Sequence, residues 1–139
     1  MKTRFDHEKL DVYQEAIAFV SWVDELLENI PKGLAVHNQL DRASTSVPLN
    51  TAEGNGKYTA ADRCRFFDIA RGSALECAAC LDVLVAKKRI EEADMGKAML
   101  VRIVSMLVGL IRSPSPSRVY ENSDSYSTNR TESTDYEHE

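Results

Sequence analysis

Several features that would indicate a secreted, membrane-bound or disulfide-rich protein are scarce in this sequence. Only three cysteines occur among the 139 residues, and all three lie in one segment with helical character. An odd, clustered set of cysteines gives no disulfide framework and fits a reducing compartment. No apolar run approaches the roughly 20 residues that cross a bilayer, and the charged start MKTRFDHEKL has no apolar stretch of a secretory signal. We therefore expect a cytoplasmic protein without a membrane partner.

Most of the chain also lacks a strong charge of either sign. The formal net charge is −5, of which residues 113–139 carry −4 and residues 1–112 only −1. Residues 113–139 consist mainly of Ser, Thr, Asn, Tyr and acidic residues, too few of them apolar to offset the entropy lost on ordering. The composition therefore predicts two segments: a folded domain over residues 1–112 and a disordered acidic tail over residues 113–139.

Apolar residues recur at helical spacing in four segments, at about residues 8–29, 34–53, 59–87 and 92–111, and no segment shows the alternation of a strand. Asp6 is the expected N-cap of the first helix, and Thr59 that of the third. Short connections between four helices predict an all-α, antiparallel up-and-down four-helix bundle. On the fourth helix the expected apolar side is Met95, Met99, Ile103, Met106, Leu107 and Leu110.

The first helix carries two apolar lines where one contact inside a bundle needs a single line. The line that we expect to face the core is Leu10, Tyr13, Ile17, Val20, Leu27 and Ile30. A second line, on another side, is Phe19, Trp22 and Leu26. This excess of apolar surface favours burial between subunits, and hence a homo-oligomer, over a monomer with one broad line.

The stretch VPLNTAEGNGKY, residues 47–58, resembles at first the end of a phosphate-binding loop. That motif needs an earlier glycine, a Ser or Thr after the lysine, and a preceding strand; here a helix precedes it, and Thr51 and Tyr58 occupy the two positions. The alternative interpretation is a helix that is kinked at Pro48 and closed by Gly54 or Gly56 in a left-handed conformation. The second interpretation is the one we adopt.

No metal or cofactor site is indicated by the sequence. Cys64, Cys77 and Cys80 provide no second pair of ligands for a structural zinc ion, so we expect small buried side chains in a helix contact. None of the three histidines follows a glutamate by three residues, which excludes the di-iron motif of four-helix bundles. We expect neither a cofactor nor a small-molecule substrate.

Five polar residues near the middle of the chain are candidates for a structural polar network between the second and third helices: Asn50, Glu53, Arg71, Ser73 and Glu76. An arginine paired with carboxylates there would fix the register of the two helices. The alternative is that Glu53, Arg71 and Glu76 lie exposed on the surface. No nucleophile or base completes a catalytic set, so we expect no enzyme activity.

Candidate nucleic-acid contacts are few. The basic residues in question are Arg63, Arg65, Lys87, Lys88 and Arg89. Arg63 and Arg65 point in different directions on a helix, and the other three lie at a helix end, where cations suit the dipole anyway. Because phosphate binding grows with the number of cationic contacts, the sequence predicts at most weak binding of RNA or DNA.

Two strings, QLDRASTSVPLNTAEGNGKYT (39–59) and FFDIARGSALECAACLDVL (66–84), resemble the signature of a bacterial four-helix-bundle family. Its members include the proteins encoded by intervening sequences within large-subunit ribosomal RNA genes, and the accessory variability protein of diversity-generating retroelements is similar. The matching positions are Gln39, Leu40, Arg42, Ala43, Ser46, Pro48, Asn50, Ala52, Glu53, Gly54, Ala70, Gly72, Ser73 and Glu76. Thr51 departs from the pattern, where an aliphatic residue is usual.

The resemblance covers about residues 8–112 and implies a bundle that assembles as a homopentamer around a central channel, without enzyme activity. For the retroelement member it implies binding to nucleic acid and reverse transcriptase through a basic surface, which the near-neutral body of this chain matches poorly. The sequence therefore predicts a non-enzymatic, homo-oligomeric binding or scaffold module that binds nucleic acid weakly. The alternative is a protein–protein scaffold with no role in nucleic-acid binding.

Overall fold

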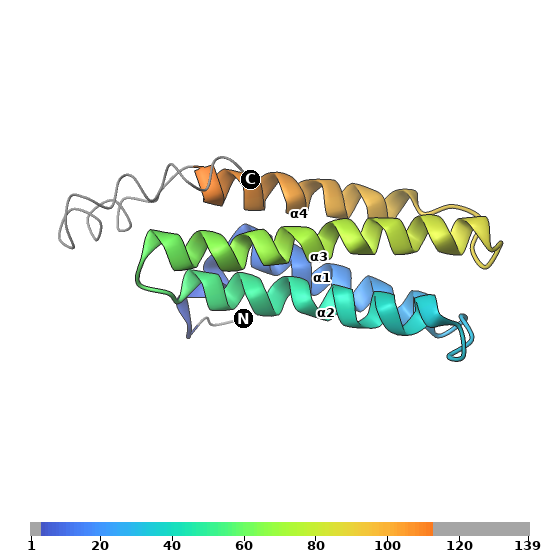
Figure 1. Cartoon of the computed structure of the whole chain (residues 1–139). Coiled ribbons are helices and arrows are strands. Elements are labelled where there is room, and N and C mark those ends of the chain that lie inside the picture. Colours follow the sequence, from blue (N-terminus) through green and yellow to red (C-terminus); the bar gives the residue numbers. More distant parts are fainter. Residues whose placement is uncertain (1–3, 113–139) are drawn as a thin grey trace.

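The computed structural model describes residues 4–112, which form a short 3-10 helix, η1 (Asp6–Lys9), and four long helices. These are α1 (Asp11–Leu27), α2 (Ala35–Asn55), α3 (Ala60–Ala86) and α4 (Asp94–Arg112). The long helices lie side by side and alternate in direction, and the start of α1 and the end of α4 lie at the same end (Figure 1). Residues 4–112 contain no strand. This confirms the predicted up-and-down four-helix bundle, whereas the predicted tail lies outside the described residues.

The bundle is closed because each helix packs against two others. α3 contacts α2 and α4, and α1 contacts the same two helices from the other side. The largest fully buried side chains come from all four helices and meet along the axis of the bundle: Phe19 and Val23 of α1, Leu40 and Val47 of α2, Phe67, Leu81 and Leu84 of α3, and Ile103 and Leu107 of α4. One continuous core therefore holds the four helices together.

The core-facing line of α1 differs from the one expected from the sequence. The buried residues are Val12, Ala16, Phe19, Val23 and Leu27, followed by Ile30 in the turn. Of the predicted line, Leu27 and Ile30 are buried, Tyr13 and Val20 are half-buried, and Ile17 is 45% exposed. The prediction was wrong because both lines are apolar. The face that points between α2 and α4 is fixed by where those helices lie, which periodicity alone does not reveal.

The helix boundaries agree with the predicted ones within two residues for α2, α3 and α4. Thr59 is the N-cap of α3 as predicted: its hydroxyl oxygen accepts a hydrogen bond from the Asp62 N–H at 3.1 Å. Asp6 is not an N-cap, because it lies inside η1 and its carboxylate accepts a hydrogen bond from the Asn55 side chain at 3.0 Å. Leu10 precedes α1 and has no side-chain acceptor to offer.

The core-facing line of α4 also differs from the one expected from the sequence. Its buried residues are Gly96, Leu100, Ile103 and Leu107. The predicted Met95 is 65% exposed, while Met99, Met106 and Leu110 pack at the edge of the core. The structure places a glycine, which gives no hydrophobic signal in a sequence, in contact with the core.

Candidate interaction surfaces

A small polar contact joins α2 to α3. The hydroxyl oxygens of Ser46 and Ser73 lie 2.8 Å apart, and the Asn50 side-chain amide donates to the Ser46 hydroxyl at 2.9 Å. The same amide donates to the Ser46 carbonyl at 3.0 Å. The structure thus links two residues of the predicted network, Asn50 and Ser73, through Ser46. Ser46 was missed, although its position one turn before Asn50 on the same helix face was a usable signal.

The other three residues of the predicted network lie outside this contact. Arg71 pairs with Asp68 on its own helix, with Nη2–Oδ1 at 3.0 Å and Nε–Oδ1 at 3.1 Å. Glu53 lies 3.7 Å from the ammonium of Lys57, and Glu76 is exposed. The interhelical arginine–carboxylate pairing was therefore a wrong prediction. Water solvates these exposed carboxylates, so no partner across the helix contact is needed.

Gly54 and Gly56 do not close α2 in the left-handed conformation that the sequence predicted. α2 runs through the buried Pro48 as far as Asn55, and Gly56 is its C-cap with φ −88°. No glycine in residues 4–112 has a positive φ, so the predicted left-handed closure by Gly54 or Gly56 is wrong. Gly54 instead lies buried under the ring of Phe67, where an added Cβ would come within 2.9 Å of two ring carbons. Its function is to let α3 approach α2 closely.

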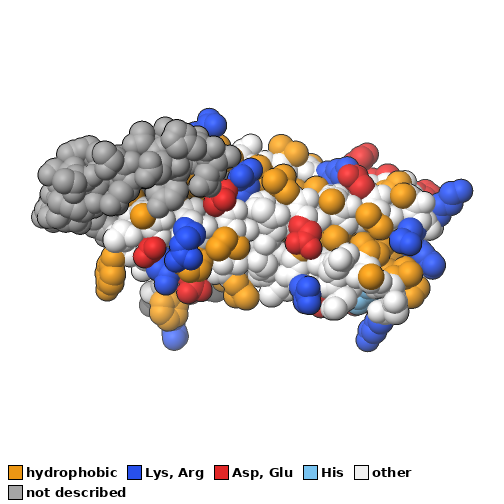
Figure 2. All heavy atoms as spheres, viewed as in Figure 1, with side chains coloured by type: hydrophobic (Ala, Val, Ile, Leu, Met, Phe, Trp, Pro, Cys, Tyr) orange, Lys and Arg blue, Asp and Glu red, His pale blue; other side chains and the backbone are white. Residues whose placement is uncertain are grey.

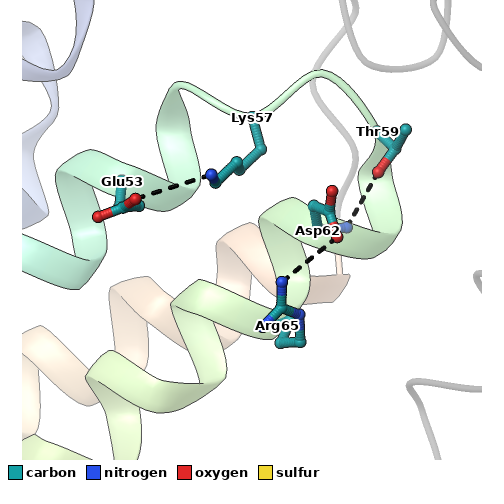
Figure 3. A network of polar contacts seen from close by, with 5 residues as sticks. All are labelled: Glu53, Lys57, Thr59, Asp62 and Arg65. Carbon is teal, nitrogen blue, oxygen red and sulfur yellow. Dashed lines mark hydrogen bonds and ion pairs between the residues drawn. The ribbon is translucent and has the colours of Figure 1, made fainter.

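The turn between α2 and α3 gathers cationic and aromatic side chains. The Lys57 Nζ lies 4.9 Å, and the Arg65 Cζ 4.7 Å, from the centroid of the Phe66 ring. Arg63 donates from its Nε to the carbonyl of Lys57 at 2.6 Å. Figure 3 shows the two carboxylates that accompany these cations, Glu53 beside Lys57 and Asp62 beside Arg65. Tyr58, at the tip of the turn, is 84% exposed.

The other basic group lies at the opposite end of α3. Lys88 follows the helix with φ 60°, and the N–H groups of Lys88 and Arg89 donate to the carbonyls of Val85 and Leu84, both at 2.9 Å. This is the Schellman closure usually made by glycine. Lys87, Lys88 and Arg89 are all exposed, and several Lys and Arg side chains are visible at this end of the bundle (Figure 2). The five predicted nucleic-acid residues thus form two separate groups.

The cysteines lie on the inner side of α3. Cys77 is fully buried and Cys80 nearly so. Burial, and then the neighbouring Cys80 and Glu76, raise the pKa of the Cys77 thiol to about 12; burial, and then Glu76, raise the pKa of Cys80. Such thiols stay protonated near neutral pH and are poor nucleophiles and metal ligands. Within residues 4–112, no three His, Cys, Asp or Glu side chains converge on a point where they could hold a metal ion.

An apolar groove runs between α3 and α4 on the outside of the bundle. Its volume is about 280 Å³, and its lining residues are Ala74, Leu75, Ala78, Lys97, Leu100, Val101, Val104 and Ser105. Val101 and Leu75 are 66% and 48% exposed. Lys97 is paired with the Asp82 carboxylate, so no unpaired charge borders the groove there. Nothing in the helices of residues 4–112 reaches the length and hydropathy of a membrane span.

Comparisons with known proteins agree on the bundle. A search of curated proteins finds no significant match. A crystal structure of a protein of unknown function from the S23 ribosomal protein family of Bacteroides thetaiotaomicron is similar, with a TM-score of 0.68 and 22% sequence identity over 73% of this chain and 99% of that one. At this identity the similarity shows the fold. The model of one protein family matches residues 8–109, and the chain thus belongs to the 23S rRNA-intervening sequence protein family.

Proposed function

We propose that this chain is a non-enzymatic, cytoplasmic binding or scaffold module that assembles with copies of itself. The observation that carries the proposal is the apolar groove between α3 and α4, where Val101 and Leu75 are 66% and 48% exposed. Exposed contiguous apolar surface on a small domain is typical of an interface. A homopentamer is the assembly that the family resemblance implies.

A second copy of the chain suits the groove for two reasons. The alanines at positions 74 and 78 line it, and small residues let a helix from another molecule approach closely. The chain also offers apolar side chains on the other two helices, Ile17 on α1 and Leu49 on α2, which are 45% and 62% exposed. The groove of one copy can therefore bind the exposed apolar side chains of the next copy in a head-to-tail contact. Such contacts form a closed ring when the rotation between neighbouring copies is a whole fraction of a full turn.

The molar mass in solution tests the assembly. Light scattering after gel filtration is expected to give a multiple of the 15.6 kDa chain mass, and Val101→Glu is expected to lower it, because burying a carboxylate in an apolar contact is costly. Met95→Glu is the matched control, since Met95 is 65% exposed on the same helix but does not line the groove. A wild-type monomer, or an unchanged mass for Val101→Glu, would contradict the proposal.

Weak binding of nucleic acid is the second part of the proposed function. It is supported by the exposed cations at both ends of α3 and by the family name, which refers to sequences that intervene in 23S rRNA. The similarity to the retroelement accessory protein stays a prediction, and the near-neutral body of this chain gives it little support. The alternative, a protein–protein scaffold, follows if labelled single-stranded RNA and DNA fail to bind at low salt, both with and without residues 113–139.

A further inference from the structure

Tyr58 is the most exposed of the large apolar and aromatic side chains in the part of the chain that the structure describes. Its ring is 84% exposed, yet the backbone on both sides of it is fixed. The Lys57 carbonyl accepts the Arg63 hydrogen bond at 2.6 Å, and the Lys57 N–H donates to the Gly54 carbonyl at 3.1 Å. On the other side, Thr59 caps α3. An aromatic ring on a fixed turn loses little entropy when a flat ligand stacks on it.

Two cations lie at the same end of α3 and are loosely paired: Lys57 directly precedes Tyr58 in the chain, and Arg65 lies in the first turns of α3. Lys57 and Arg65 both lie against the Phe66 ring, so one aromatic side chain holds both cations at this end of α3. Their carboxylate partners, Glu53 and Asp62, are 3.7 Å and 3.6 Å away and about half exposed. These separations exceed that of a direct hydrogen bond, and exposed pairs of this kind contribute little free energy. A phosphate group can therefore compete with the carboxylates for the two cations.

We infer that the turn between α2 and α3 binds single-stranded nucleic acid, with a base stacked on Tyr58 and the flanking phosphates on Lys57 and Arg65. An exposed aromatic ring next to cations is how proteins bind single strands without sequence preference. A duplex hides the faces of its bases, so the turn favours single strands. This inference rests on the nucleic-acid part of the proposed function, and it selects one of the two basic ends.

The opposite end of α3 lacks the exposed aromatic ring that defines this site. Lys87, Lys88 and Arg89 are exposed there, but the turn from Lys87 to Asp94 contains no aromatic residue. It can attract phosphates but offers no aromatic ring on which a base can stack. Lys88 is therefore a matched charge control, and Met95, an exposed side chain at the start of α4, is a matched control for losing exposed apolar surface.

The test is fluorescence anisotropy of the full chain with a labelled RNA of about 12 nucleotides, within the site sizes of single-strand binders. Tyr58→Ala is expected to weaken binding about 5- to 100-fold, the range of one lost base stack, whereas Tyr58→Phe retains it. Lys57→Gln with Arg65→Gln is expected to weaken binding and to make log Kd less steep against log salt by about 1.4. Lys88→Gln and Met95→Ala are expected to bind as the wild type does.

The outcomes separate this inference from the function on which it rests. If the wild-type chain binds no single strand at low salt, the nucleic-acid part of the proposed function fails, and the inference fails with it. If the wild type binds and Tyr58→Ala binds equally well, nucleic-acid binding stands and the Tyr58 site is wrong. Tighter binding to the duplex than to either strand also overturns it. Single-stranded DNA of the same sequence is expected to bind like the RNA, because stacking and phosphate contacts need no 2′-hydroxyl.

Discussion

Gly54 in α2 and Gly96 in α4 each let an aromatic ring from another helix lie against the backbone, but the two rings are held differently. Gly54 faces Phe67 of α3, whose side chain is fully buried. Gly96 faces the far end of the Trp22 ring of α1, which is only partly buried and stacks on Phe19. An added Cβ would come within 2.9 Å of the Phe67 ring and within 2.5 Å of the Trp22 ring.

The shorter of the two distances does not identify the tighter contact. Phe67 has no room to move, because close-packed neighbours surround it. Trp22 reaches solvent on one side and can swing outwards when something enters beneath it. The α2–α3 contact is therefore expected to be the rigid one, and the α1–α4 contact the adjustable one.

Truncating the two rings is expected to give the largest effects. Phe67→Ala should lower the free energy of unfolding by about 3–5 kcal/mol, the range for a fully buried phenylalanine. Trp22→Ala should cost less, because part of its ring already contacts water in the folded state. Urea unfolding followed by circular dichroism measures both. A larger loss for Trp22→Ala than for Phe67→Ala would reverse the order of the two contacts.

Adding one methyl group to each glycine tests the same contrast more directly. Gly54→Ala is expected to cost about 1–3 kcal/mol, because the Cβ overpacks a ring that cannot move. Gly96→Ala should be close to neutral, since alanine favours a helix by about 1 kcal/mol over glycine and this offsets the displacement of Trp22. Thermal melts of both variants measure these effects, and Gly72→Ala, at an exposed position, measures the contribution of helix propensity alone. A larger loss of stability for Gly96→Ala than for Gly54→Ala would contradict the prediction.

Alkaline pH is expected to lower the free energy of unfolding through the buried Cys77 thiol of α3. Below about pH 8.5 the Cys77 thiol is protonated in both the folded and unfolded chain, so it adds no pH dependence. At higher pH the unfolded chain releases this proton while the folded chain retains it up to about pH 12. The free energy of unfolding should then fall by up to about 1.4 kcal/mol per pH unit. Between pH 8 and 10.5 the free energy of unfolding of the wild type should therefore fall more steeply with pH than that of Cys77→Ala; equal slopes for the two proteins would exclude this cause.

A loss of stability of about 1 kcal/mol is expected from removing the hydrogen bond that crosses the contact between α2 and α3. Ser73→Ala removes the partner of Ser46 and is expected to cost about 1 kcal/mol, a typical net value for one hydrogen bond. The cost stays small because Ser46 keeps its bond from Asn50. Ser21→Ala, at an exposed position of α1, is the control and should change the unfolding midpoint little. Equal effects of the two substitutions would mean that the Ser46–Ser73 bond adds no stability.

The sequence predicted the existence of the four helices and the limits of α2, α3 and α4, because these depend on local signals. Apolar periodicity, the Thr59 cap and the short turns are all properties of neighbouring residues. Most of the errors concern tertiary placement, whereas the Asp6 cap and the left-handed glycine closure were errors in local signals. Two apolar lines on α1 compete equally until the positions of α2 and α4 are known. The polar Thr51 also lies in the core, where its hydroxyl donates to the Val47 carbonyl at 2.7 Å. A hydroxyl satisfied within its own helix is buried at little cost.

The candidate surfaces were less accessible to sequence reasoning. The link from Asn50 to Ser73 was anticipated only as part of a larger ionic network, because spacing shows which residues share a helix face and not which face lies opposite. The Phe66 ring that holds Lys57 and Arg65 was not recognised, since a phenylalanine in an apolar segment gives no signal of exposure. The groove between α3 and α4 required the arrangement of two helices. Each of these features depends on how the helices are placed relative to one another.

The up-and-down order of the helices has a kinetic consequence. Three of the four helix contacts join elements that follow one another along the chain, and such contacts form at a low cost in loop-closure entropy. The fourth joins α1 to α4, where Arg102 and Glu15 are 87 positions apart in the chain. We expect this pair to form late in folding. Substitutions between α1 and α4 should therefore accelerate unfolding and leave the folding rate nearly unchanged, while those between α2 and α3 should slow folding.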